Sequence, residues 1–165
     1  MDSIEDLMKN TPYDFRWARQ TEWKSAILLV WKTFMAFEAR EYTQEGIRGF
    51  FEFVSDDDIY RAFLKGTYQV LLALDGDRII GVASIRNRNL LSLLFVDEEY
   101  HRQGVGRILV ELLKAYLRDE MGEFLMTVKA APYAVEFYKK CGFAATGPEQ
   151  EKQGIRTTPM ECFLK

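Results

Sequence analysis

Cysteine and histidine are scarce in this chain. Its 165 residues include two cysteines, Cys141 and Cys162, and a single histidine, His101. The cysteines form no CxxC pair, which argues against a disulfide framework and against a zinc site. One histidine cannot build a histidine-based metal cluster, and it is the only histidine that a Ser-His-Asp or Cys-His arrangement could use. The sequence therefore predicts free, buried thiols and no bound metal.

Long apolar runs, charge blocks and a signal sequence are also missing. The longest apolar run, residues 26–31, is far shorter than the ~20 residues that cross a bilayer. Lysine and arginine number 22 against 25 aspartates and glutamates, so the basic footprint of a nucleic-acid-binding domain is absent. Residues 1–6 are acidic and lack the basic and apolar segments of a signal peptide. We therefore expect no membrane or nucleic-acid partner and a cytoplasmic location.

What the chain does contain is typical of one globular domain. Hydrophobic residues make up 48% of the sequence and charged residues 28%, which excludes a mainly disordered chain. The length is close to the ~150 residues of an average domain, which is enough to form a hydrophobic core without disulfide or metal cross-links. No repeat or linker interrupts it. We expect a single domain over residues 1–165.

The first third of the sequence predicts helices. After a short strand at 15–18, Thr21 is a candidate N-cap for a helix that reaches about Glu41. A second helix is expected over 46–54, and Ser55 would cap a third. The apolar stripe of the first helix follows the helical period. Its positions are Ile27, Val30, Trp31, Phe34 and Glu38.

After Gly66 the pattern changes to that of strands. The runs 68–74 and 78–86 flank a turn around Gly76, where glycine supplies the positive φ that a hairpin requires. The run 90–96 is almost entirely apolar and predicts a central strand buried on both faces.

The second half of the chain alternates helix and strand. Helices are expected over 104–121 and 132–141, and strands over 124–129, 143–146 and 158–164. The order of elements predicts an α/β fold with a sheet of mixed strand direction.

The start of the helix 104–121 is a candidate phosphate site. Unpaired N–H groups and the helix dipole bind anions there, and Gly104 and Gly106 allow a phosphate to approach the backbone. Arg102 and Arg107 flank the glycines and can add charge-assisted hydrogen bonds. A bare GxG is also compatible with an ordinary helix start, and neither a complete dinucleotide fingerprint nor a P-loop is present.

Two motifs in order make the chain resemble the GNAT superfamily of acyl-CoA-dependent N-acetyltransferases. The first is Gln/Arg-x-x-Gly-x-Gly/Ala after the central strand, filled here by residues 101–106, with His101 where Gln or Arg is usual. The second is a late helix that ends in Tyr-x-x-x-Gly-Phe, filled here by residues 131–143. The specific similarity covers about residues 79–143.

This resemblance implies a GNAT-like α/β fold with a mixed, mostly antiparallel central sheet. Helices flank the sheet, which splays open at the acyl-CoA cleft after a bulged strand at 94–96. Acetyl-CoA is implied as cosubstrate, its pantetheine arm pairing with that strand and its pyrophosphate with the following loop. The residues implied to bind it are Leu94, Phe95, Val96, His101, Arg102, Gln103, Gly104, Val105, Gly106 and Arg107.

Tyr138 is the implied catalytic residue, because it aligns with the family tyrosine that protonates the departing thiolate. A tyrosine pKa of about 10 against about 8.5 for a thiol makes full transfer uphill by roughly 1.5 units, so a hydrogen bond to the sulfur is the alternative. Tyr138 also fits a helical core stripe with Ala134, Phe137 and Cys141, which is a purely structural interpretation.

The sequence does not identify the general base. An acceptor amine with a pKa near 10.4 must lose a proton, which costs about 4.6 kcal/mol at pH 7. The strand 90–96 has no ionisable residue, although many relatives place their base there. Glu38, Glu41, Glu45 and Glu151 are the candidates elsewhere.

Lys129 is a departure from the family pattern, since many close relatives carry Asn at this position. The extra cation would repel an amine, contact CoA or point to solvent. The segments 42–47 and 154–160 are similar to parts of a small bacterial-type subgroup that border the acceptor cleft, or else they only shape the core and a loop.

Three functions stay open. The leading one is transfer of an acetyl group from acetyl-CoA to a primary amine of a small molecule or peptide, by direct attack in a ternary complex. The alternatives are a non-catalytic acyl-CoA-binding regulatory module and a nucleotide-binding domain. Exposed aromatic residues on the early helices are compatible with a homodimer.

Overall fold

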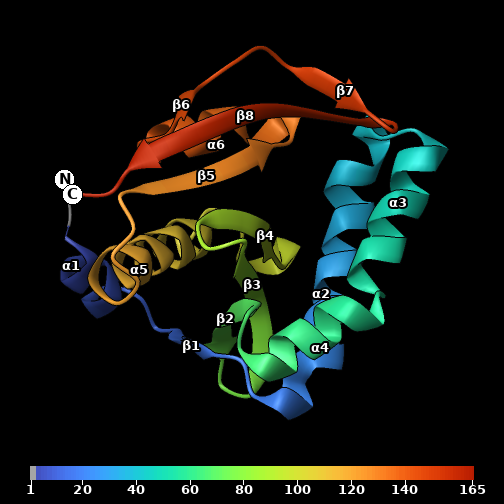
Figure 1. Ribbon diagram of the computed structural model, residues 1–165. Helices are drawn as coiled ribbons and strands as arrows, with labels where there is room; N and C mark the ends of the chain where they lie inside the picture. The colour runs from blue at the N-terminus through green and yellow to red at the C-terminus, as the bar shows by residue number, and fades with distance from the viewer. Residues whose placement is uncertain (1–2) are drawn as a thin grey trace.

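An open β-sheet organises the computed structural model, which describes residues 3–165. Within this range eight strands pair in the order β1-β2-β3-β4-β5-β8-β6, and β7 pairs with β8 (Figure 1). All paired strands are antiparallel except β4 and β5. The expected mixed, mostly antiparallel sheet is thereby confirmed. The strands are β1 (Asp14–Trp17), β2 (Gln69–Asp75), β3 (Arg78–Arg86), β4 (Leu90–Val96), β5 (Leu125–Ala130), β6 (Ala144–Ala145), β7 (Gln150–Lys152) and β8 (Ile155–Phe163).

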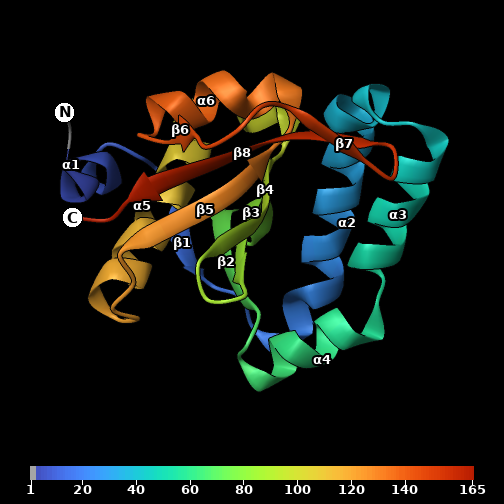
Figure 2. The same cartoon turned by 45° about the horizontal axis from the view of Figure 1, so that its top comes forward.

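Helices flank both faces of the sheet. The helices are α1 (Ile4–Lys9), α2 (Trp23–Thr33), α3 (Gln44–Val54), α4 (Asp57–Lys65), α5 (Val105–Asp119) and α6 (Val135–Lys140). Helices α2, α3 and α4 lie on one face, where Val30 and Phe34 are fully buried, and α5 and α6 lie on the other, where Leu109 and Leu113 are fully buried (Figure 2). None of the helices in residues 3–165 is long and apolar enough to span a membrane.

A bulge in β4 divides its side chains between the two cores. The register with β3 shifts so that Ser92 is the extra residue, which corrects the expected bulge at 94–96. Because an extra residue reverses the alternation of a strand, Leu91 packs in the core with α5, while Leu93 and Phe95 pack in the core with α2.

The sheet splays apart beyond the start of β4, as expected. Strands β4 and β5 pair only through Leu90 and Leu91 of β4, and then diverge. The expected burial of β4 on both faces is wrong, because buried and half-buried positions alternate along it. The half-buried positions are Leu90, Ser92, Leu94 and Val96. The apolar sequence of β4 therefore reflects a strand whose open side faces a cavity.

The helical course that begins at α2 reaches Glu41, as predicted, but not as one α-helix. The α-helical turns end at Thr33, a π-helical turn follows over Phe34–Glu38, and a 3₁₀ turn over Ala39–Glu41 completes it. A π turn accommodates an additional residue per turn, and such turns are frequent at functional sites. Of the predicted stripe, Val30 and Phe34 are fully buried, and the others are half-buried.

Two predicted helix caps are each wrong by one residue. Thr21 lies in a 3₁₀ turn, and α2 begins at Trp23 after Glu22. Asp56, not Ser55, caps α4, because its carboxylate accepts from the Asp58 N–H at 2.8 Å. Local sequence patterns also missed the short helix α1 and strand β7.

The β7–β8 hairpin packs against the start of α3. The Thr43 N–H donates to the carbonyl of Gly154 at 3.2 Å. A Cβ on Gly46 would lie 2.5 Å from that same carbonyl oxygen, so glycine is required for this approach. The contact brings together the segments 42–47 and 154–160.

Candidate active site

A cavity of about 620 Å³ opens between β4, β5 and the π-helical turn after α2. It collects nearly all the residues that the sequence marked. Those that line it are Leu94, Phe95, Val96, His101, Arg102, Gly104, Val105, Gly106, Arg107 and Tyr138. Gln103 does not line it, because its side chain accepts a hydrogen bond from Tyr13 Oη at 2.5 Å.

One end of the cavity is an uncapped helix N-terminus. The first intrahelical bond of α5 joins the Ile108 N–H to the Gly104 carbonyl, so the N–H groups of residues 105–107 have no acceptor within the helix. Gly104 has a φ of +80°, and no heavy atom lies within 4 Å of the place its Cβ would take. This cradle of free N–H groups fits the pyrophosphate of a nucleotide-type ligand.

Three cations line the cavity, two beside the start of α5 and one at the end of α6. They are Arg102, Arg107 and Lys140, and none of them forms an ion pair with an acid in residues 3–165. Their charge is therefore free to balance an anion. Lys140 was not singled out from the sequence, although it belongs to the late-helix motif.

His101 joins the end of β4 to the π-helical turn. Its Nε2–H donates to the carbonyl of Val96 at 2.7 Å, since a carbonyl can only accept. Its ring lies 4.9 Å from that of Phe37. The histidine thus supports the cavity wall at the position where the family motif has Gln or Arg.

Tyr138 is a core residue whose hydroxyl faces the cavity. The side chain is only 6% exposed, and its ring lies edge-on to Phe137 and Phe143 at 5.2 and 5.4 Å. Burial, with Tyr133 and Glu38 nearby, raises the pKa of Tyr138 far above its usual value. No residue in the described range hydrogen-bonds this hydroxyl, which therefore stays protonated and able to donate.

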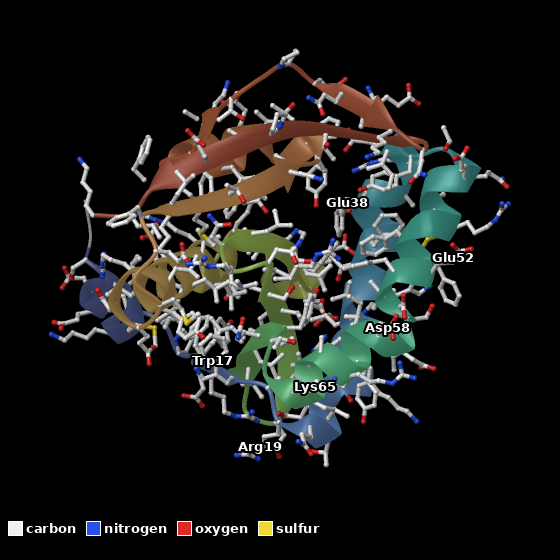
Figure 3. All side chains as sticks on the ribbon, viewed as in Figure 1. Trp17, Arg19, Glu38, Glu52, Asp58 and Lys65 are labelled. Atoms are coloured by element: carbon white, nitrogen blue, oxygen red, sulfur yellow. The ribbon has the colours of Figure 1, made fainter. Side chains whose placement is uncertain are left out.

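Glu38 is the acid that the π-helical turn brings into the cavity (Figure 3). Tyr133 Oη donates to its Oε1 across 3.5 Å. Burial, and then the neighbouring Glu41, raise the pKa of Glu38 to about 7. A carboxyl with this pKa can accept a proton near neutral pH.

The other three candidate bases do not line the cavity. Glu41 lies 3.9 Å from Arg156, while Glu45 and Glu151 are exposed on α3 and β7. Tyr42 does line it, from the segment 42–47 that the resemblance placed at the acceptor cleft, and so does Tyr133, to which sequence reasoning gave no role. Tyr133 directly follows the proline that opens the late-helix motif.

The two cysteines are free and buried, as predicted. Burial raises the pKa of the Cys141 thiol to about 11, which leaves it protonated at neutral pH. Within residues 3–165, no three His, Cys, Asp or Glu side chains gather in an arrangement that could hold a metal ion.

Comparison with known proteins shows where this architecture occurs. A family model described as an acetyltransferase (GNAT) domain matches residues 38–164. A GCN5-related N-acetyltransferase from Rhodopseudomonas palustris is 22% identical, with a TM-score of 0.80 over 93% of this chain and 97% of that chain. No curated protein matches the chain.

Two further solved structures share the fold. The PaiA N-acetyltransferase from Thermoplasma acidophilum, in complex with coenzyme A, is 16% identical, with a TM-score of 0.75 over 93% of this chain and 99% of that chain. A chimera of the spermidine N-acetyltransferase SpeG from Vibrio cholerae and hSSAT is 15% identical, with a TM-score of 0.67 over 93% and 96%. With the family model spanning most of its length, the chain belongs to the GNAT family of acetyltransferases.

Proposed function

We propose that the protein transfers an acetyl group from acetyl-CoA to a primary amine by direct attack in a ternary complex. The observation that carries the proposal is one cavity that joins three features. These are the free N–H groups at the start of α5, the hydroxyl of Tyr138 and the carboxyl of Glu38. Acetyl-CoA would supply the acetyl group as an activated thioester.

Both backbone groups and cationic side chains of the chain would bind acetyl-CoA. The N–H groups of residues 105–107 would hold the pyrophosphate, with Arg102 and Arg107 adding charge. The side of β4 that β5 leaves unpaired beyond Leu91 would pair with the pantetheine arm. That a protein of the same fold was solved in complex with coenzyme A supports a ligand of this class.

Glu38 would act as the general base. The amine reaches the cavity mostly as an ammonium ion and must lose a proton before its nitrogen lone pair can attack the thioester carbonyl. A base is most efficient when its pKa lies near the working pH, and the pKa of Glu38 is about 7. Glu38 therefore supplies the proton acceptor that β4 lacks.

Tyr138 would hold the departing sulfur. As the new C–N bond forms, the C–S bond breaks and its electron pair leaves on sulfur. The raised pKa of Tyr138 makes complete proton transfer to a thiolate unfavourable, so the hydroxyl donates a hydrogen bond that stabilises the developing charge. Of the two protons that the ammonium nitrogen loses overall, one ends on the thiol and one in solvent.

The alternative of a non-catalytic acyl-CoA-binding module has less support. It drew on the absence of a base from β4 and on Lys129 in place of the usual Asn, and Glu38 lines the same cavity as β4 as a candidate base.

The test is thiol release from acetyl-CoA across a panel of primary amines, with Tyr138→Phe beside the wild-type protein. We expect kcat to fall about 100-fold in Tyr138→Phe, because one donor to a developing charge is lost. The Kd for acetyl-CoA should change less than twofold, and the ring should keep its packing. Tyr60→Phe, on the exposed surface of α4, is the matched control. Unchanged turnover in Tyr138→Phe would reject the assigned role.

A further inference from the structure

Lys129 is a cation in the cavity that the proposed reaction does not use. It lies on β5 at the wall of the cavity, two residues before the loop that leads to Tyr133. Its ammonium group forms no ion pair or side-chain hydrogen bond with any residue in the range 3–165. A charged group with no internal partner is free to bind a ligand.

The alternation of side chains along β5 decides to which face of the strand Lys129 points. Met126, Val128 and Ala130 point into the core that contains α5. Because successive side chains of a strand point to opposite faces, Lys129 points away from that core, and it lines the cavity together with Glu38 of the π-helical turn. The helix N-terminus assigned to the pyrophosphate belongs to the α5 side. Lys129 therefore lies on the side away from the phosphates.

Glu38 borders the cavity from this same side, at the end of the helical course of α2 (Figure 3). Glu41 also lies nearby, but it faces Arg156 of β8 at 3.9 Å. The acceptor half of the cavity thus presents one proton-accepting carboxyl and one unpaired ammonium group, on different elements.

We infer that the acceptor is an amino carboxylate, whose amine lies toward Glu38 and whose carboxylate lies toward Lys129. This inference rests on the proposed function. Opposite charges at the two ends of the substrate complement those of the cavity, whereas a diamine or polyamine would set a second cation against Lys129. A single ammonium group suits the single charge of a carboxylate better than a doubly charged phosphate, which usually gathers several donors.

The aromatic lining adds a preference for the rest of the acceptor. Phe37, Tyr42 and Tyr133 line the cavity around Glu38. Apolar and aromatic walls bind the body of a small ligand, while a few polar groups fix its orientation. Amino acids with an apolar or aromatic side chain are therefore the first acceptors to examine.

The experiment compares acceptors that differ only in the carboxylate. Phenylalanine, methionine and 4-aminobutyrate are each paired with their amides, and putrescine and spermidine represent the polyamines. Thiol release from acetyl-CoA is measured at equal concentrations of unprotonated amine, because an amide lowers the pKa of its amine. We expect kcat/KM to be at least about tenfold higher for the best carboxylate than for its amide, the size of one charge-assisted hydrogen bond.

Variants of Lys129 assign that preference to one residue. Lys129→Gln should raise KM for the carboxylates about tenfold, with kcat within twofold of wild type and the amides unaffected. Lys129→Glu should reverse the preference in favour of putrescine and spermidine. Lys65→Gln, on the exposed end of α4, is the matched control (Figure 3).

The outcomes separate this inference from the proposed function. Transfer to amides or polyamines at least as fast as to carboxylates would overturn the inference and leave the acetyltransferase proposal standing. A rise in the Kd for acetyl-CoA in Lys129→Gln would also overturn it, because the lysine would then serve CoA. Absence of transfer to every acceptor would reject the proposed function together with the inference.

Discussion

The carboxyl of Glu38 changes its charge near neutral pH, so its proposed role predicts the pH dependence of the enzyme. With a pKa of about 7, Glu38 is protonated and inactive as a base below that pH. We expect kcat/KM to rise about tenfold per pH unit below 7 and to level off above it, apart from ionisation of the acceptor. Glu38→Gln should lower kcat at least about 100-fold and lose the inflection near pH 7. An inflection that persists in Glu38→Gln would assign the titration to another group.

The same raised pKa predicts that Glu38 costs stability. A carboxyl that binds its proton more tightly in the folded state lowers the free energy of unfolding as pH rises from 4.5 to 7, and the full cost applies above 7. Removing the charge in Glu38→Gln should therefore stabilise the protein at pH 8 by about 3 kcal/mol, or about 6 to 12 °C in Tm. At pH 4 the two proteins should melt alike. Thermal unfolding at both pH values checks this, and equal melting at pH 8 would contradict it.

At the scale of the element, the start of α5 makes a separate prediction about cosubstrate binding. A Cβ at Gly106 would meet the Phe137 ring at 3.4 Å and Val96 at 3.7 Å, so a first carbon fits but a branched side chain extends into the cavity. We expect Gly106→Val to weaken binding of acetyl-CoA at least about tenfold, measured by calorimetry, because the N–H groups are no longer approachable. Gly49→Val, where a Cβ meets nothing within 4 Å, is the control. Equal affinity in Gly106→Val would show that the phosphates bind elsewhere.

The elements that the sequence predicted best are those with local signals. The Gly76 hairpin and the amphipathic helix α5 follow from turn chemistry and periodicity, and both are present. The bulge at Ser92 and the true caps of α2 and α4 depend on register and on competing side chains, which a one-dimensional pattern does not contain. The predicted burial of β4 was wrong for a related reason, because the divergence of β5 from β4 belongs to the tertiary structure and leaves no signal in the sequence of β4.

Residues of the candidate site could be predicted where they lie close together in the sequence, but not where the fold brings distant segments together. Ten of the predicted residues line one cavity: nine follow one another closely at the end of β4 and the start of α5, and Tyr138 comes from the late-helix motif. Choosing Glu38 from four candidate acids required knowing how the π-helical turn faces β4. The face of β5 to which Lys129 points likewise follows from the packing of its neighbours on that strand.

At the scale of the whole molecule, ligand binding should be visible as thermal stabilisation. A ligand that binds only the folded state at 100 times its Kd adds about 2.7 kcal/mol, or about 5 to 10 °C in Tm for a chain of this size. We expect acetyl-CoA to produce this shift in differential scanning calorimetry. ATP and NAD at the same concentrations should produce far smaller shifts, and a larger shift with either would favour the nucleotide-binding function instead.

The short pairing between β4 and β5 gives the molecule a seam. Strands β1 to β4 belong to the first 96 residues and β5 to β8 to the rest, and the two groups share a ladder of only two residue pairs. The loop proposed to bind the phosphates follows the first group, whereas Lys129 and Tyr138 follow in the second part of the chain. The proposed activity thus depends on how the two groups of strands pack against each other. A substitution that loosens their shared core would disable the enzyme without altering any group that touches a substrate.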